Sequence, residues 1–197
     1  MSAIPAPPLL VASTSPQRPA ILRQLGIPFD VVAPRYEEHD PPDADPEALV
    51  RAHARAKARS VADGAGDRLV LGVDTTVCAG SRVYSKAESP AEAISMLEEL
   101  AGREHVVVSG LCLVTPGWEV VETERTVVRF RDLTPRDLAA YVATGEWEGR
   151  AGAYGIQGRG AALVERIEGD YLNVVGLPGA LLVRLLAERF AGVYGFG

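Results

Sequence analysis

Groups that bind phosphate come together near the start of the chain, where residues 13–18 have the sequence Ser-Thr-Ser-Pro-Gln-Arg. The stretch follows a short apolar run and leads into a helical pattern, with Ser15 suited to the N-cap and Pro16 to the first helical position. Free backbone N–H groups at a helix N-terminus attract anions, and the Ser13 hydroxyl and the forked Arg18 guanidinium add further donors. The spacing also fits an ordinary capped helix with a surface arginine, so both interpretations stay open.

An acidic side chain, Asp74, comes directly after the apolar run at residues 69–73, which predicts a buried strand. In open α/β sheets, ligands gather beyond the carboxyl ends of the strands. A carboxylate in that place can hold a divalent cation or remove a proton from water. An Asx-turn residue that leaves a strand has the same pattern, and the sequence alone does not separate the two.

The third feature is a glycine-rich run at residues 150–158, Arg-Ala-Gly-Ala-Tyr-Gly-Ile-Gln-Gly. Glycines let a backbone approach a ligand closely, and the Gln157 amide offers a paired donor and acceptor to the edge of a base. The spacing fits neither a Walker phosphate loop nor a dinucleotide-binding turn, and an irregular loop is the alternative. Together with the first two features, the run favours an anionic small-molecule ligand.

The elements that must position these residues alternate between strands and helices. Apolar runs predict strands at residues 9–12, 29–33, 69–73 and 161–167, and two longer strands at 105–115 and 119–131. Helices are predicted at residues 16–25, 46–62, 90–101, 135–144 and 178–191, and residues 34–46 form an acidic, proline-rich loop. Because hairpins at residues 77–84 and 115–119 interrupt the alternation, we expect an α/β fold with a mixed sheet flanked by helices. Residues 1–197 are expected to form one domain.

Composition excludes several classes of protein. The chain has 197 residues, and 20 Lys and Arg against 26 Asp and Glu give a net charge of −6. An acidic chain argues against nucleic-acid binding, and no apolar run reaches the roughly 20 residues of a membrane span. Cys78 and Cys112 form no metal-ligand pattern and are expected in the core of a cytoplasmic protein. His39, His53 and His105 share no ligand spacing, so we expect ordinary surface or packing roles for them.

Four stretches, in order along nearly the whole chain, resemble the Maf family of nucleoside triphosphate pyrophosphatases. They are residues 12–18 (Ala-Ser-Thr-Ser-Pro-Gln-Arg), 72–77 (Gly-Val-Asp-Thr-Thr-Val), 151–158 (Ala-Gly-Ala-Tyr-Gly-Ile-Gln-Gly) and 173–178 (Asn-Val-Val-Gly-Leu-Pro). The resemblance implies a mixed α/β fold with a central cleft between two lobes, usually in a homodimer. It also implies hydrolysis of a nucleoside triphosphate to monophosphate and pyrophosphate, with Mg²⁺ or Mn²⁺ as the metal.

The family motifs imply roles for individual residues of this chain. Asp74 matches the catalytic aspartate that acts on the attacking water with metal assistance, and Glu38 matches a glutamate that supports the metal or the water. Arg18, Lys57 and Lys86 match basic residues that hold the triphosphate. The alternative function is a non-enzymatic nucleotide sensor that regulates cell division.

Three positions bear on which nucleotide is preferred. Thr75 and Gln157 match positions that distinguish the family branch acting on dTTP and UTP from the branch acting on 7-methyl-GTP, and both favour the first branch. Gln17 departs from both branches, which usually have arginine or tryptophan there. Glutamine keeps hydrogen-bonding ability but lacks the permanent charge of arginine. We therefore expect dTTP, UTP or a related modified nucleotide as the substrate.

Overall fold

The computed structural model describes residues 6–39, 41 and 44–197, so Asp40, Pro42 and Asp43 of the predicted acidic loop lie outside the described residues. The strands are β1 (Leu9–Ala12), β2 (Phe29–Val32), β3 (Val70–Ala79), β4 (Arg82–Tyr84), β5 (Glu104–Thr115), β6 (Trp118–Phe130) and β7 (Val164–Glu168). The helices are α1 (Gln17–Gln24), α2 (Pro46–Ala62), α3 (Pro90–Leu100), α4 (Pro135–Val142), α5 (Tyr171–Val175) and α6 (Gly179–Arg189), with a 3₁₀ helix at Gly158–Leu163.

The strands of the described chain form a seven-stranded sheet with the order β2-β1-β3-β5-β6-β7, and β4 pairs with β3. Strand β1 pairs in parallel with both of its neighbours, whereas the other pairs are antiparallel. The predicted mixed sheet flanked by helices is therefore confirmed.

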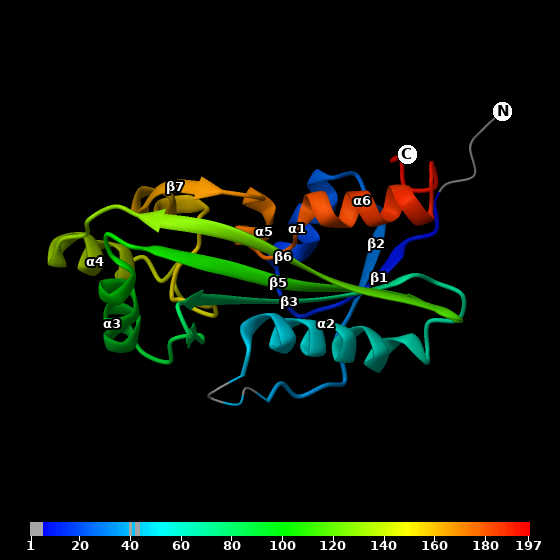
Figure 1. The fold of residues 1–197 in the computed structure, drawn as a ribbon, viewed down its shortest axis with the longest axis horizontal. Coiled ribbons are helices and arrows are strands. Elements are labelled where there is room, and N and C mark those ends of the chain that lie inside the picture. The colour runs from blue at the N-terminus through cyan, green and yellow to red at the C-terminus, as the bar shows by residue number, and fades with distance from the viewer. Residues whose placement is uncertain (1–5, 40, 42–43) are drawn as a thin grey trace.

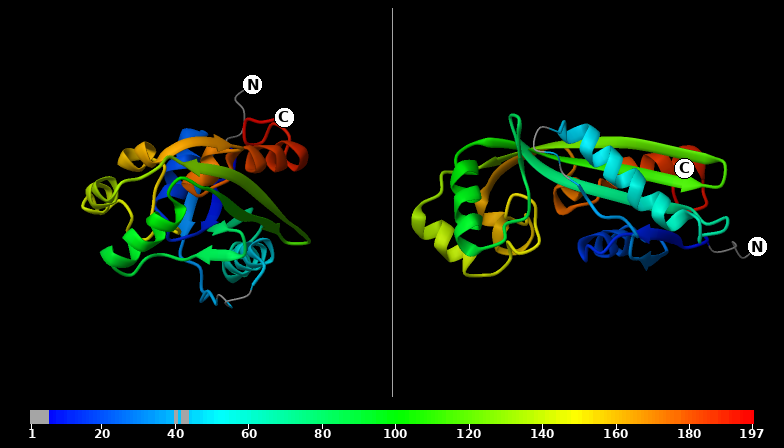
Figure 2. Two further views of the ribbon diagram at one scale, coloured as in Figure 1. Left: turned by 60° about the vertical axis from the view of Figure 1, so that its left-hand side comes forward. Right: turned by 90° about the horizontal axis from the view of Figure 1, so that it is seen from below.

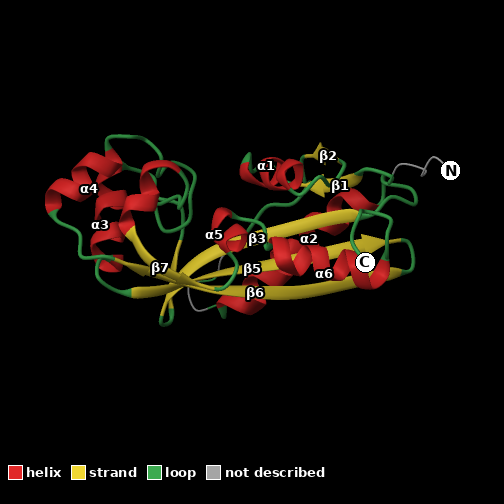
Figure 3. Ribbon diagram, turned by 90° about the horizontal axis from the view of Figure 1, so that it is seen from above, coloured by secondary structure: helices red, strands yellow, loops and turns green. Residues whose placement is uncertain are grey.

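Two lobes share the long strands of this sheet. Strands β3, β5 and β6 have 10, 12 and 13 residues and run from one lobe into the other (Figure 1). Helices α3 and α4 lie at one end of these strands, and β1, β2, α1 and α6 lie at the other end (Figure 3). This is the two-lobed arrangement that the family resemblance implied.

The sequence predicted a strand at residues 69–73 that ends before Asp74, and this prediction is wrong. Strand β3 continues to Ala79, because β5 pairs with it along its length, with Asp74 opposite Gly110 and Cys78 opposite Val106. On its other side, the pairing with β1 stops at Ala12 opposite Gly72. Asp74 thus lies within a strand, two residues past the last residue that pairs with β1. Because β1 no longer covers this edge of β3, Asp74 is able to line a cavity.

Helix α2 lies along one face of the long strands (Figure 2). It also supplies side chains to the cavity of the site. Its buried residues recur with helical spacing and are Val50, His53, Ala54, Lys57, Ala58 and Val61. Two glycines of the sheet admit the helix: a Cβ at Gly72 would lie 2.1 Å from the Ala54 carbonyl oxygen, and one at Gly110 would lie 2.2 Å from that of Val50. The close approach brings the helix side chains within reach of β3.

We expect Gly72→Ala to destabilise the protein by about 3 kcal/mol, because the added methyl group must push α2 away from β3. Urea unfolding of the wild type and the variant measures the difference. Gly64→Ala is the matched control, since its Cβ would have only the Val61 carbonyl oxygen nearby, at 3.9 Å. Equal stability of the Gly72 variant and the wild type would contradict the tight packing of α2.

The five-residue helix α5 was not predicted, although it completes the site. It is held by Asn173, which is fully buried and donates from Nδ2 to the Val107 carbonyl oxygen and to Thr126 Oγ1, both at 3.1 Å. The carbonyl of Gly176, directly after the helix, is thereby fixed over the sheet. A long-range anchor of this kind leaves little local signal in the sequence.

Smaller predictions were corrected as well. The N-cap of α1 is Pro16 without a side-chain cap, and the Ser15 hydroxyl instead contacts the Gln17 side chain. The predicted strand at residues 161–167 begins only at Val164, because the 3₁₀ helix occupies its first part. Cys78 and Cys112 are free and buried, as predicted. Of the described helices, none combines the length and the apolar character needed to cross a bilayer.

The buried side chain of His105 makes the free energy of unfolding depend on pH. It is 1% exposed and packs edge-on against Phe130 and Tyr154, and burial lowers its pKa from 6.5 to about 4. Between these pH values the unfolded chain binds a proton that the folded chain does not, so stability falls as the pH falls. We expect a loss on the order of 3 kcal/mol across this window.

The measurement is urea unfolding at several pH values between 6.5 and about 4, for the wild type and for His105→Gln. The glutamine has no group that titrates there, so the difference between the two proteins isolates the histidine from the carboxylates. Parallel pH curves for the two proteins would show that His105 is not the cause.

Candidate active site

A cavity of about 610 Å³ opens between the two lobes. The turn after β1, helix α2 and the middle of β3 line one side of it, and residues 83–88 and 149–154 line the other. The turn after α5 closes the site near Gly176. The cleft implied by the family resemblance is therefore present, and both lobes contribute to it.

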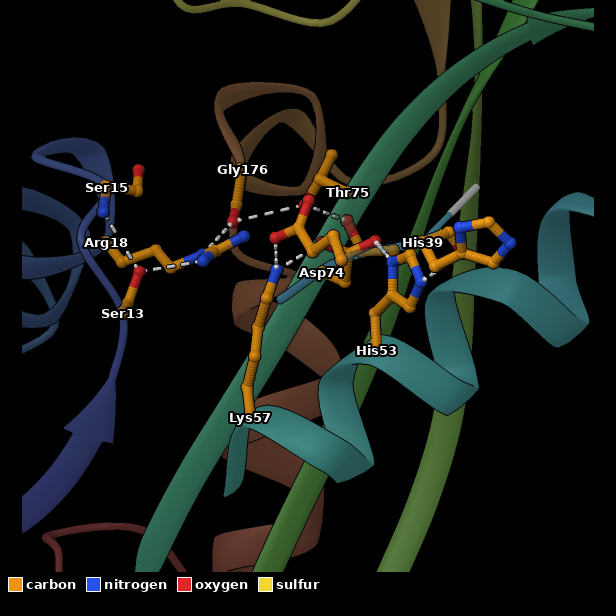
Figure 4. Close-up of polar contacts among 11 residues, drawn as sticks. Ser13, Ser15, Arg18, His39, His53, Lys57, Asp74, Thr75 and Gly176 are labelled. Atoms are coloured by element: carbon orange, nitrogen blue, oxygen red, sulfur yellow. Dashed lines mark hydrogen bonds and ion pairs between the residues drawn. The ribbon is translucent and has the colours of Figure 1, made fainter. Parts of the chain in front are cut away.

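Asp74 is the centre of the charged groups in this cavity. Lys57 Nζ donates to Asp74 Oδ1 at 2.6 Å, and His53 Nδ1 lies 3.4 Å from Asp74 Oδ2 (Figure 4). Residues four apart lie on the same face of a helix, which is why both side chains reach the carboxylate from α2. Alternate residues of a strand face opposite sides of the sheet, so Asp74 faces α2 with Gly72, whereas Thr75 faces α5.

The surroundings keep the Asp74 carboxylate ionised. Burial would raise its pKa, but the contact with His53, the Lys57 ammonium and the charge of Arg18 together lower it to about 2. The side chain is largely buried, which strengthens each of these interactions relative to water. Asp74 is therefore a permanent negative charge near neutral pH.

Glu38 provides a second carboxylate on the other side of Lys57. Its Oε1 lies 2.5 Å from Lys57 Nζ, and its side chain is 42% exposed. Glu38, His53 and Asp74 each offer one ligand atom, and these atoms all lie within 4.8 Å of one another. Two oxygens and a nitrogen in this arrangement suit a divalent metal ion, so the donor set fits the metal that the family resemblance implies.

Arg18, at the start of α1, is held between the turn after β1 and the turn after α5. Its Nη1 donates to Ser13 Oγ at 2.7 Å and its Nε to the Gly176 carbonyl oxygen at 3.1 Å. Desolvation lowers its pKa, and the charges of Asp74 and Glu38 oppose that change. Since Ser13 also accepts from the backbone N–H of Ser15, the turn and the guanidinium form one connected unit.

The remaining predicted residues are placed differently. Thr75 lines the cavity, with its Oγ1 2.8 Å from Ser109 Oγ. Lys86 and Gln17 also line it, and the backbone of Lys86 pairs with Ala151 of the glycine-rich run. Gln157 is exposed at the start of the 3₁₀ helix and is not among the described residues that line the cavity.

His53 is the site residue that sequence reasoning missed. It was expected to have an ordinary packing or surface role, yet its buried ring contacts Asp74. The signal that could have found it is its spacing of four from Lys57, on the same apolar face of a helix as Ala54 and Ala58.

The model of the family described as Maf-like protein matches residues 8–189 of this chain. The chain belongs to the Maf family. One relative, a "dTTP/UTP pyrophosphatase" of Moorella thermoacetica, is 51% identical over 189 residues, which cover 95% of this chain and 97% of the relative. Another of that name, from Deinococcus radiodurans, is 43% identical over the full length of both chains. A solved structure, "The structure of the Staphylococcus aureus Ham1 protein", covers 64% of this chain and 73% of its own at a TM-score of 0.45 and 14% identity.

Membership in the Maf family confirms the resemblance drawn from the four stretches at residues 12–18, 72–77, 151–158 and 173–178. The structure brings parts of all four to one cavity: the turn with Arg18, the strand with Asp74, the backbone at Ala151 and the turn at Gly176. The order of these stretches in the sequence thus corresponds to a shared location in the Maf fold.

Proposed function

We propose that this protein hydrolyses nucleoside triphosphates between the α and β phosphates, giving a nucleoside monophosphate and pyrophosphate, with dTTP and UTP as the substrate class. The observation that carries the proposal is the ionised Asp74 facing Lys57, with Arg18 nearby, inside a cavity between two lobes. The names of the relatives, which are 41–51% identical over most of the chain, support the same reaction.

The cations bind and orient the polyphosphate. Arg18 presents its remaining N–H donors from the start of α1, and Lys57 presents its ammonium from α2. Lys86 is exposed on the opposite side of the cavity, where it is able to reach phosphate oxygens from the other direction. Phosphoryl chemistry depends mainly on such positioning and charge neutralisation, so the net charge of the whole chain is less important than this local cluster.

Asp74 and Glu38 would hold a Mg²⁺ or Mn²⁺ ion. When bound, such an ion neutralises phosphate charge and lowers the pKa of a water molecule on it. Because the pKa of Asp74 is about 2, this carboxylate is a weak proton acceptor near neutral pH. In the proposal, Asp74 therefore helps to hold and orient the metal ion. Lys57 fixes the direction of the Asp74 carboxylate through its contact with Oδ1.

The base is recognised by groups farther along the cavity. Thr75 and Gln17 line the cavity and supply polar atoms, whereas Gln157 lies outside the lining residues in this structure. The preference for a pyrimidine therefore rests on Thr75 and on the relatives, and base reading by Gln157 stays a prediction.

A panel of nucleoside triphosphates tests the proposal. We expect dTTP and UTP to give the highest kcat/KM for pyrophosphate release, above 7-methyl-GTP and the common purine triphosphates. A higher value for 7-methyl-GTP would contradict the substrate class. If the protein bound the nucleotides but hydrolysed none of them, the result would contradict the proposed enzyme activity and favour the nucleotide sensor.

The proposal also includes a homodimer and a cytoplasmic location. The homodimer that the family resemblance implies is checked by light scattering of the purified protein. A cytoplasmic location is supported by the two free cysteines, since thiols stay reduced there.

A further inference from the structure

The proposed reaction assigns the metal ion to Asp74 and Glu38, and a histidine next to these two carboxylates is a third possible ligand. His53 comes from α2, one turn before Lys57, and is 3% exposed. Its ring packs edge-on against Tyr36, with 5.7 Å between the ring centres, and contacts Asp74 through Nδ1. The ring is thus held in one orientation, with its Nδ1 toward the group of possible metal ligands.

The contact at the far side of the ring determines which nitrogen can bind a cation. His53 Nε2 lies 3.3 Å from the carbonyl oxygen of His39, and a carbonyl only accepts hydrogen bonds. A hydrogen on Nε2 would donate to that carbonyl, which leaves Nδ1 as the nitrogen that is able to bind a metal ion. Metal-binding histidines typically donate their other N–H to a carbonyl or carboxylate in this way.

Nδ1 faces the ionised Asp74 carboxylate, and the hydrogen bond between them helps to lower the pKa of Asp74. A metal ion that binds both Nδ1 and Oδ2, which lie 3.4 Å apart, would take the place of the proton in this contact. Lys57 contacts the other carboxylate oxygen, Oδ1, so its ammonium does not fill this position. A carboxylate oxygen of Glu38 lies within 4.8 Å of a ligand atom of both His53 and Asp74.

We infer that His53 is a nitrogen ligand of the metal site, which it forms with Asp74 and Glu38. The inference rests on the proposed function, because the metal is the one that the reaction would use. An imidazole ligand favours divalent transition metals over Mg²⁺, which prefers oxygen. The site therefore binds Mn²⁺ more tightly than Mg²⁺, and the selectivity comes from His53.

The experiment is Mn²⁺ titration of the full-length protein, followed by pulsed electron paramagnetic resonance, with Mn²⁺ as the probe. We expect a nitrogen hyperfine coupling in the wild type that changes when the protein is made with isotope-labelled histidine rings. In His53→Asn the coupling disappears and Mn²⁺ affinity falls by about tenfold or more, while Mg²⁺ affinity changes little. Competition between Mg²⁺ and Mn²⁺ measures the Mg²⁺ affinity.

The chain offers a matched control. It has three histidines, and His39, which is exposed next to the site, contacts His53 through its backbone carbonyl. His39→Asn is expected to keep both the coupling and the Mn²⁺ affinity. Loss of the coupling in this control, but not in His53→Asn, would overturn the inference. The labelled wild type needs no substitution, so the test survives a variant that fails to fold.

The inference and the proposed function fail in different ways. A wild type that releases pyrophosphate but shows no histidine coupling, or binds no Mn²⁺, overturns the role of His53 and leaves the reaction standing. A histidine coupling without hydrolysis of any triphosphate overturns the reaction and leaves the metal ligand standing.

Discussion

Asp74→Asn is expected to lower kcat for pyrophosphate release by at least about 10³-fold. The substitution keeps the size of the side chain but removes its negative charge. In the wild type, the two carboxylate oxygens lie 2.6 Å from Lys57 Nζ and 3.4 Å from His53 Nδ1. Without that charge, Asp74 would neither hold the proposed metal ion nor fix the ammonium of Lys57. Steady-state assays with dTTP and Mg²⁺ measure the effect, with pyrophosphate as the product detected.

Two controls separate chemistry from folding. Asp30 is an exposed carboxylate paired with Arg68 outside the cavity, and Asp30→Asn is expected to leave kcat unchanged. Thermal unfolding of Asp74→Asn is expected to show a folded protein, because Lys57 keeps Glu38 as a partner. A folded Asp74 variant with wild-type turnover would remove Asp74 from the mechanism.

Lys57→Met is expected to lower kcat/KM by about 10²-fold. The ammonium is buried between Asp74 and Glu38, so its removal leaves two carboxylates without their shared cation. The pKa of Asp74 should rise as a result, because Lys57 is one of the groups that lower it. A pH profile of kcat/KM that loses activity at higher pH than in the wild type would report this change.

Arg59→Met is the matched control for the lysine variant. Arg59 lies two residues further along α2, but its side chain is 56% exposed and contacts Glu119 instead of the cavity. Exposed ion pairs contribute little, so both activity and stability should stay near the wild type. Equal losses in the two variants would mean that the effect of Lys57 is a general effect of α2.

Helix α2 shows what the sequence predicts well. Its observed bounds, Pro46–Ala62, match the prediction, because Asp45 caps the helix through the backbone N–H of Ala48 and glycine follows its end. These are local signals that need no knowledge of the rest of the fold. The same helix contains Lys57, which the family motif identified, and His53, which no motif identified.

Strand β3 shows where local signals fail. Asp74 and the two threonines after it are polar, so the strand was predicted to end there, yet it continues because β5 pairs with it from more than 30 residues away. The same holds for Asn173, whose partners Val107 and Thr126 lie on two distant strands. The surroundings of the site depend on pairings that only the folded chain defines.

The role of Gln157 in base recognition, which the family motif implied, stays a prediction. Its stretch resembles that of the family, and the neighbouring backbone at Ala151 reaches the cavity, but the amide itself is exposed outside it. A motif places a segment near a site more securely than it places one side chain within it. Arg18, Lys57 and Asp74, in contrast, all line one cavity, and hydrogen bonds hold their side chains there.

The most direct test of the account is the identity of the two products formed from dTTP in the presence of Mg²⁺. Separation by anion-exchange chromatography distinguishes a monophosphate with pyrophosphate from a diphosphate with phosphate. We predict dTMP and pyrophosphate in equal amounts, with no dTDP at any time. Formation of dTDP and phosphate, or intact dTTP after long incubation with folded protein, would contradict the account.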